Sequence, residues 1–235
     1  MERNTSKPDR TAAERSLLLG SLTIVFVLMS CGPSIDPAAK RDIDARIANL
    51  RVSSTVVAAP PPGRLESMRP AVGQWVQYKV SLPDGRVKFV TKKIIGEHAG
   101  ALWYERVDET YEGRVVQQLL FAVDDHADPA KVELRAARTK NEKGRVVTLS
   151  RPTMWQESYW AEAEAVAHIR RWPALPRETT VVPAGRFEGC YREHTVDDVW
   201  WHPNVPLSGL VRVEIGSGVT FELVAYGVTG ARSDF

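Results

Sequence analysis

Residues 75–90 read WVQYKVSLPDGRVKFV, and this stretch decides the fold class. Over its first six residues, polar and apolar side chains alternate with the two-residue period of a β-strand that buries one face. The PDG sequence at 83–85 then signals a turn, because proline presets φ and glycine accepts positive φ. An extended segment follows at 87–95, so the stretch predicts two antiparallel strands.

The same extended character recurs along most of the remaining chain. Short segments, bounded by glycine, proline and other turn residues, follow one another at intervals of roughly 8–12 residues. They occupy residues 101–109, 114–123, 132–138, 145–149, 179–182, 185–195, 197–202, 209–215 and 219–227. We therefore expect a mainly β domain over residues 68–235, built as a single curved antiparallel sheet, or half-open barrel.

One segment, residues 156–171, interrupts the strands and is predicted to be a helix. It is rich in alanine and glutamate and contains neither proline nor glycine. Trp172 ends it, because a residue that precedes a proline avoids the α conformation. Two interpretations remain open. The inserted helix covers the open side of the sheet, or it is a mobile lid over an apolar cavity.

A second helix is expected ahead of the sheet, within residues 31–67. Asp36 is a suitable N-cap, and Pro37 suits the first helical position. Prolines at 60–62 then favour an extended spacer, which places the domain boundary before residue 68. The apolar residues of this tether helix form one narrow stripe, which packs on the domain or against a partner. They are Ile43, Ile47 and Leu50.

Cys31 carries the most specific signal of the chain. An apolar run at 17–29 precedes it, and small residues flank it in the sequence LMSCG at 28–32. This resembles the lipobox of bacterial lipoproteins. The resemblance implies that residues 1–30 are removed as a signal peptide and that Cys31 is acylated as the mature N-terminus. The run is shorter than the roughly 20 apolar residues needed to span a bilayer.

Two other interpretations of the leader remain open, namely an uncleaved membrane anchor and an ordinary secretory signal. In the lipoprotein interpretation, the membrane is a partner through the lipid on Cys31. Gly32 stands where aspartate is the familiar inner-membrane retention signal of many diderm bacteria. The resemblance therefore implies the outer membrane, with the domain facing the periplasm.

Charge and cysteine content argue against several classes of function. The chain has 31 Lys plus Arg and 29 Asp plus Glu, a net charge of +2, so no basic surface for nucleic acid is indicated. It contains two cysteines. With lipid on Cys31, Cys190 has no disulfide partner. Its strand context predicts a buried, small apolar side chain rather than a reactive thiol.

Several segments resemble a loose group of bacterial envelope proteins. They are GQWVQY at 73–78, VPAGRF at 182–187, DVWW at 198–201, VPLSGLV at 205–211 and LVAYG at 223–227. That group is similar to the half-open antiparallel barrels of lipoprotein-carrier (LolA/LolB-like) proteins. The resemblance implies such a fold over residues 73–230. It implies no catalytic residues, because the matching positions are glycines, prolines and apolar residues of the core.

The best local set of metal-ligating residue types consists of His194, Asp197, Asp198 and His202. A metal site needs three ligands within ~2 Å of one ion, whereas strand residues four apart are separated by ~13 Å. Only a bend at 196–198 would bring them together. We therefore predict neither a metal site nor a bound cofactor.

Nucleophilic catalysis is not indicated either. Cys190 and His194 share one strand face, but they too are ~13 Å apart along a strand. The carboxylate pairs at 124–125 and 197–198 are adjacent residues, which point to opposite faces of a strand. The chain contains no G-x-S-x-G, phosphate-loop or dinucleotide motif. An enzyme would require the histidines and aspartates at 194–202 to converge.

Two groups of basic residues lie on the predicted strands. Either they meet anionic lipid headgroups beside the anchor, or they protect sheet edges and keep the chain soluble. They are Arg135, Arg138, Lys140, Lys143 and Arg145 around one hairpin, and Lys88, Lys92 and Lys93 on another strand.

The sequence thus favours a non-catalytic, lipid-anchored envelope protein. A single sheet must cover its apolar face with a helix or a ligand, so we expect it to bind a lipid or another hydrophobic ligand. The alternative is a structural module that presents a sheet edge or the Ile43 stripe to another envelope protein. The sequence identifies no individual ligand-binding residue.

Replacing Cys31 with serine tests the anchor. The substitution removes the thiol that would carry the lipid, so we expect the protein to leave the membrane fraction when cells are fractionated. Cys190→Ala is the control and is expected to stay with the membrane. A Cys31→Ser protein that remains in the membrane unchanged would refute the lipoprotein interpretation.

Overall fold

The alternating pattern of the sequence produces strands throughout the described part of the chain. The computed structural model describes residues 34–59, 70–123, 132–148 and 175–235. Within these ranges one helix, α1 (Pro37–Asn49), precedes the strands. The strands are β1 (Val56–Val57), β2 (Trp75–Ser81), β3 (Val87–His98), β4 (Ala101–Thr110), β5 (Gly113–Val123), β6 (Val132–Lys140), β7 (Val146–Thr148), β8 (Arg177–Val182), β9 (Gly185–His194), β10 (Asp198–Trp201), β11 (Leu210–Glu214) and β12 (Thr220–Gly227).

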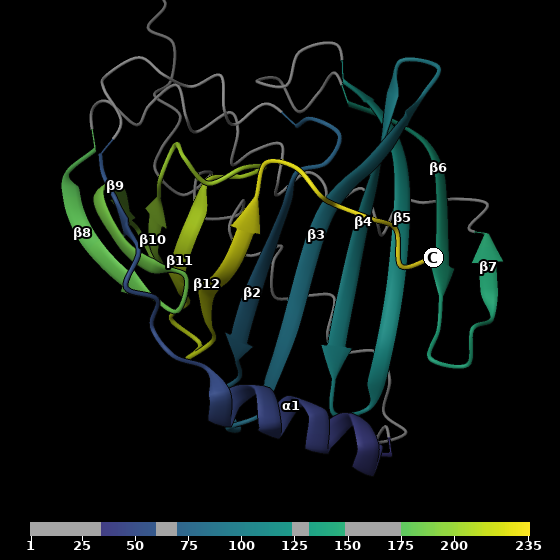
Figure 1. Cartoon of the computed structure of the whole chain (residues 1–235), viewed down its shortest axis with the longest axis horizontal. Coiled ribbons are helices and arrows are strands. Elements are labelled where there is room, and N and C mark those ends of the chain that lie inside the picture. Colours follow the sequence, from purple (N-terminus) through teal and green to yellow (C-terminus); the bar gives the residue numbers. More distant parts are fainter. Residues whose placement is uncertain (1–33, 60–69, 124–131, 149–174) are drawn as a thin grey trace, which may run out of the picture. The chain divides into compact units, whose positions relative to one another are not determined.

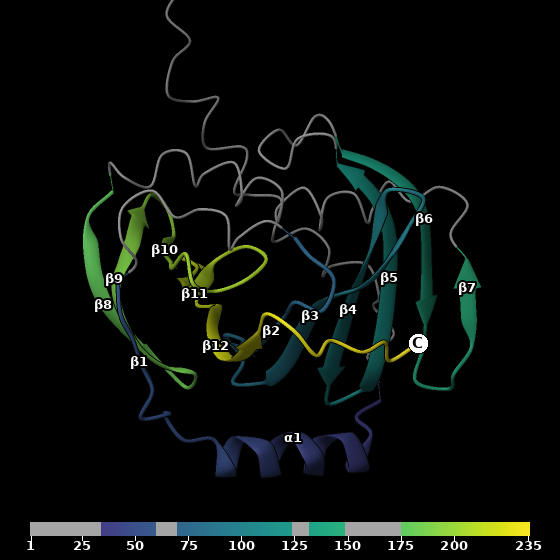
Figure 2. The ribbon, with the colours of Figure 1, turned by 45° about the horizontal axis from the view of Figure 1, so that its top comes forward.

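These strands form one open, curved sheet (Figures 1 and 2). Their order is β1-β9-β10-β11-β12-β2-β3-β4-β5-β6-β7, and β8 pairs with β9. The pairs are antiparallel except for β1 with β9. The predicted mainly β fold with a single curved sheet and an N-terminal helix is therefore confirmed. Strands β2 to β12 coincide with the segments that the sequence pattern predicts, with ends shifted by a few residues.

Cross-strand pairing gives the central strands two faces, which we name after one residue each. The Tyr78 face includes Tyr78 on β2, its partner Val90 on β3, and Tyr104 on β4. The Lys93 face is the other side of the same strands and includes Lys93 on β3 and its partner Glu105 on β4. Neighbouring residues of a strand point to opposite faces, so each strand contributes to both.

The Tyr78 face is covered by the sheet itself and by the connection between β10 and β11. Val205 and Leu207 in that connection are buried in the same apolar cluster as Tyr78. The hydroxyl of Tyr78 donates a hydrogen bond to the Leu210 carbonyl oxygen over 3.0 Å. The cluster joins both halves of the sheet. Among its most buried members are Val76, Val80, Ile94, Phe121, Phe187, Cys190, Val211 and Leu223.

Helix α1 packs on the Lys93 face of β3, β4 and β5. Asp36 caps it by accepting a hydrogen bond from the Ala38 amide, as expected. Ile43, the first residue of the predicted stripe, is buried. Arg46 lies over the ring of Phe89 at 3.7 Å. Of the two alternatives for the stripe, the structure shows packing against the chain's own sheet.

Strand β1 is an element that the sequence pattern did not predict. Val56 and Val57 pair in parallel with Arg186 and Phe187, inside the segment that was expected to be a linker. A two-residue strand is too short to show a period, which explains why it was missed. Because α1 and β1 both contact the sheet, the described residues from Ser34 onward form one compact unit.

Several expected features lie outside the described residues. They are Cys31 with residues 1–30, the prolines at 60–62, the carboxylate pair at 124–125 and the inserted helix at 156–171. Within the described ranges, no helix combines the length and apolar character needed to cross a membrane.

Gly185 allows β1 to pack on β9, and its replacement tests that contact. Its φ is +138°, and a Cβ there would lie 2.5 Å from the carbonyl oxygen of Thr55. We expect Gly185→Ala to lower the free energy of unfolding by about 2 kcal/mol or more. Gly96 on β3 has no atom within 4 Å of such a Cβ. Gly96→Ala is therefore the control, with an expected change within about 0.5 kcal/mol in denaturant titrations.

Candidate functional site

A group of charged residues lies on the Tyr78 face, where β3 and β4 meet. We call Lys88, Lys92, Arg106 and Asp108 the Lys92 cluster. Lys92 is the direct cross-strand partner of Arg106 on β4 and of Val76 on β2. Lys88 and Asp108 lie on the same face, because each is an even number of residues from a member of that pair. The sheet register therefore gathers three cations and one carboxylate beside the apolar cluster.

Asp108 is the centre of the Lys92 cluster. Arg106 donates to it twice, from Nε to Oδ2 over 2.6 Å and from Nη2 to Oδ1 over 2.8 Å. Lys88 Nζ lies 3.6 Å from Oδ1. Lys92 Nζ lies 5.8 Å from the centre of the Tyr78 ring, within range of a cation–π contact. The Lys92 cluster is therefore bordered on one side by the ring of Tyr78.

Burial controls the protonation of this cluster. It lowers the pKa of Lys92 to about 7, and the neighbouring positive charge of Arg106 acts in the same direction. Burial also lowers the pKa of Lys88, against the attraction of Asp108. Burial opposes ionisation of Asp108, but the charges and hydrogen bonds of Arg106 and Lys88 together outweigh it, so the pKa of Asp108 is lowered. Near neutral pH, Lys92 is thus poised between its charged and neutral forms.

Apolar side chains continue the Tyr78 face next to the cluster. Ile94 follows Lys92 by two residues on β3, and its cross-strand partner is Tyr104. Leu119 on β5 is the partner of Tyr104 in turn. All three are buried. One face therefore carries a cationic end beside an apolar region, an arrangement that is suited to a ligand with an anionic head and an apolar body.

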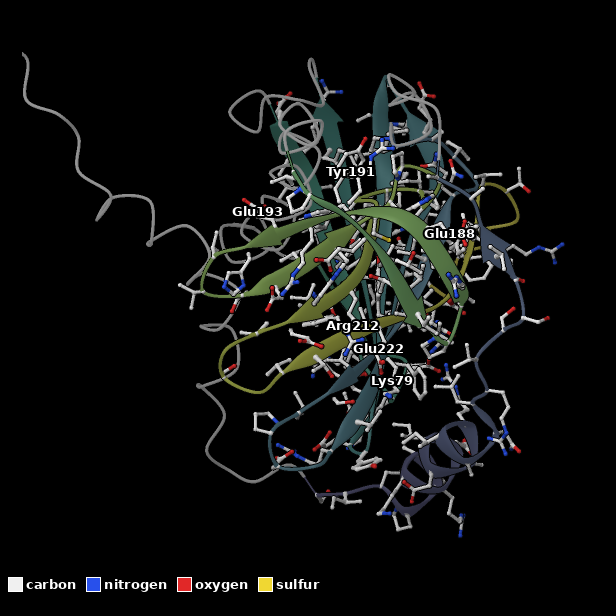
Figure 3. The ribbon with its side chains drawn as sticks, turned by 90° about the vertical axis from the view of Figure 1, so that its left-hand side faces the viewer. Lys79, Glu188, Tyr191, Glu193, Arg212 and Glu222 are labelled. Atoms are coloured by element: carbon white, nitrogen blue, oxygen red, sulfur yellow. The ribbon has the colours of Figure 1, made fainter. Side chains whose placement is uncertain are left out.

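The other face carries a row of charges at the other end of β2. Lys79, Glu222 and Arg212 are successive cross-strand partners on β2, β12 and β11. Figure 3 shows the three side chains side by side. Lys79 Nζ lies 2.7 Å from Glu222 Oε2. Because opposite charges alternate in this row, Lys79 is a useful reference lysine for comparison with Lys92.

The structure brings two residues of the candidate metal set together and gives the other two different partners. The turn at 195–197 brings His194 opposite Asp198, with 2.8 Å between Nδ1 and Oδ1. Our expectation that strand spacing keeps these two apart is therefore wrong. Asp197 instead accepts a hydrogen bond from the Gly216 amide. In the described ranges, no three His, Cys, Asp or Glu side chains are grouped closely enough to hold a metal ion.

His202 is a structural residue of the β10–β11 connection. It is fully buried, with Nε2 3.2 Å from the Glu188 carbonyl oxygen and Nδ1 accepting from the Asn204 amide. Burial lowers the pKa of His202 to about 4, so the ring is neutral at physiological pH. Its two nitrogens fix the connection that covers Tyr78.

Five of the eight predicted basic residues make contacts within the fold, whereas the other three are exposed. The exposed residues are Arg135, Lys143 and Arg145. Lys88 and Lys92 belong to the Lys92 cluster. Lys93, Arg138 and Lys140 contact the C-terminal residues on the Lys93 face. Sequence analysis missed Arg106, Asp108, Glu105 and Gln118. Their position on β4 and β5 could have indicated a site. Charged and amide side chains on central strands are rarely buried unless they have a specific partner.

Comparisons of the chain with protein-family models, with curated proteins and with solved structures found no match. The resemblance to LolA/LolB-like proteins therefore stays a prediction, and the function is inferred from the geometry of this chain's own residues.

Cys190 is buried in β9, as its sequence context predicts, and its accessibility gives a simple test. Burial raises the pKa of its thiol to about 12. In a form that starts at Gly32 and so lacks Cys31, we expect no reaction of the folded protein with a thiol reagent such as DTNB, and full reaction after denaturation. Val196→Cys, in an exposed position of the β9–β10 turn, is the control and is expected to react at once. Rapid labelling of Cys190 in the folded protein would contradict this assignment.

Proposed function

We propose that the protein is a non-catalytic, lipid-anchored envelope protein that binds an anionic amphiphile on the Tyr78 face of its sheet. One observation carries this proposal. Lys92 and Arg106 are direct cross-strand partners, and like charges in that relation destabilise a sheet. A protein that keeps such a pair beside its apolar core bears a cost in stability. Asp108 offsets part of that cost through its two hydrogen bonds from Arg106, and an anionic ligand would offset more of it.

The chemistry of the cluster indicates the class of ligand. A guanidinium and two ammonium groups suit a carboxylate or phosphate head. Ile94, Tyr104 and Leu119 are buried on the same face, so the acyl chain of a ligand would insert into the apolar cluster that they belong to. A fatty acid or an anionic phospholipid has both parts. Attachment to a membrane through Cys31, as the lipobox resemblance implies, would hold the site close to such molecules.

A second candidate is the structural interaction module. The observation that favours it is β7, which ends the sheet and exposes Val146 and Val147 by 50% and 41%. An edge strand with apolar side chains offers a template for pairing with a strand of another protein. The Ile43 stripe no longer supports this alternative, because Ile43 is buried against the chain's own sheet.

Native mass spectrometry of a soluble form that starts at Gly32 tests the amphiphile proposal. We expect co-purified or added fatty acid and anionic phospholipid to be retained. Loss of a charge-assisted hydrogen bond costs about 1.5–3 kcal/mol, so Lys92→Met and Arg106→Met should weaken binding about tenfold or more. Lys79→Met, outside the Lys92 cluster, should leave the affinity unchanged.

The pH dependence of the same binding gives an independent readout. The pKa of Lys92 is about 7, so its positive charge is lost as the pH rises through that value. An anionic head stabilises the charged form, so affinity is expected to fall between pH about 6 and about 8.5. In Lys92→Met this contribution to the pH profile should vanish. Retention of lipid that is equal in wild type and in Lys92→Met at all pH values would refute the proposed site.

A further inference from the structure

The last residues of the chain cross the Lys93 face of the sheet as an extended segment (Figure 1). We call residues 231–235 the strap. It starts where the Ala231 amide donates to the Gly73 carbonyl oxygen, and it passes over β3, β4 and β5. The strap has the sequence Ala-Arg-Ser-Asp-Phe. Its contacts with the sheet are chiefly polar.

A row of polar side chains on four neighbouring strands receives the strap. Lys93, Glu105, Gln118 and Arg138 are successive cross-strand partners on β3, β4, β5 and β6. Lys93 Nζ lies 3.0 Å from Glu105 Oε1, Gln118 donates to Glu105 over 2.6 Å, and Arg138 donates to Gln118 over 2.7 Å. Glu105 and Gln118 have no exposed surface. We call these four residues the polar row.

The polar row forms hydrogen bonds with the backbone of the strap and with the side chain of its serine. Glu105 accepts from the Asp234 amide over 2.9 Å and from the Ser233 hydroxyl over 2.8 Å. Gln118 donates to the same hydroxyl oxygen over 2.9 Å. Lys93 donates to the Arg232 carbonyl oxygen over 2.9 Å. These bonds fix both the direction of the strap and a hydroxyl group at one position.

The two following residues of the strap are recognised by charge and by aromatic contact. Asp234 pairs with Lys93 and with Arg114, whose Nη2 lies 2.6 Å from Oδ1. The ring of Phe235 lies 4.5 Å from the Arg138 guanidinium. Arg138 also stacks on Trp103 at 4.8 Å, so it is held between two rings. The site thus distinguishes three successive residues: a hydroxyl, an acid and an aromatic.

We propose that the polar row, with Arg114, is a binding site for an extended peptide segment of a partner protein with the order hydroxyl, acidic, aromatic. In this structure the strap occupies the site in cis. Covering a sheet face requires only apolar contacts, whereas burying Glu105 and Lys93 costs desolvation. A buried polar row that is matched group by group to a peptide therefore points to recognition.

Release of the strap would pivot at Gly230, because the preceding Thr229 is held by the hydrogen bond from Trp75 Nε1 to its carbonyl oxygen. Gly230 has a φ of +90°, and Val228 is 59% exposed. A strap that is tethered through Gly230 competes at an effective concentration of about millimolar. The strap therefore acts as an intramolecular competitor, and the partner segment binds fully only when the strap is displaced.

Peptide binding to the full chain tests this proposal. The probe is fluorescein-labelled Ala-Arg-Ser-Asp-Phe with an amidated C-terminus, followed by fluorescence anisotropy. Asp234→Lys puts a positive charge of the strap next to the positive charges of Lys93 and Arg114. The repulsion should release the strap. We expect this variant to bind the peptide about tenfold more tightly than wild type. A second variant that adds Arg114→Gln should lose about fivefold of that affinity.

A scrambled peptide of the same composition is the control for charge alone. Equal binding of the scrambled and native peptides to Asp234→Lys would overturn the proposal. Near-UV circular dichroism reports whether the variant is folded. Where Asp234→Lys does not fold, Asp234→Asn with Phe235→Ala takes its place, because it weakens the strap without adding charge. Absence of selective binding in that variant also overturns the proposal.

Discussion

A single-layered sheet must cover the apolar parts of its faces, and the rest of this structure depends on that constraint. On the Tyr78 face, the sheet curves onto itself and the β10–β11 connection closes it with Val205 and Leu207. His202 stabilises that connection from within, as a neutral ring with both nitrogens engaged. On the Lys93 face, α1 covers one part and the strap another. The polar row lies under a cover that is polar, the strap, whereas the Lys92 cluster lies beside the apolar cluster.

The two-residue period of the strands predicted most of this architecture. The segments with clear alternation became strands, and the glycine and proline signals between them became turns. The sequence did not predict β1, because two valines define no period. It also did not predict that His194 meets Asp198, since that contact depends on the turn at 195–197 rather than on strand spacing. Pairing between strands, which decides such contacts, is a tertiary property.

The candidate sites were harder to predict than the fold, and β3 explains why. Lys88, Lys92 and Lys93 look like one basic stretch in the sequence, with either lipid headgroups or bulk solvent as the expected surroundings. β3 instead lies in the middle of the sheet, between β2 and β4. Lys92 and Lys93 are adjacent, so they point to opposite faces. One joins the Lys92 cluster and the other joins the polar row.

The partners that β4 supplies give these two lysines different energetic roles. Lys93 faces Glu105, so opposite charges stabilise the pair on the strap side. Lys92 faces Arg106, so like charges oppose each other on the other side, and Asp108 joins them from the same strand. Glu105 and Arg106 are themselves neighbours in the sequence. A register shift of one residue would break both pairings, placing either Lys92 opposite Glu105 or Lys93 opposite Arg106. The hydrophobic pattern forbids such a shift because it would expose the core. The hydrophobic pattern that determines the fold therefore also keeps Lys92 opposite Arg106. The repulsion between these two charges lowers stability and is not needed for packing, and such local conflicts are typical of functional sites.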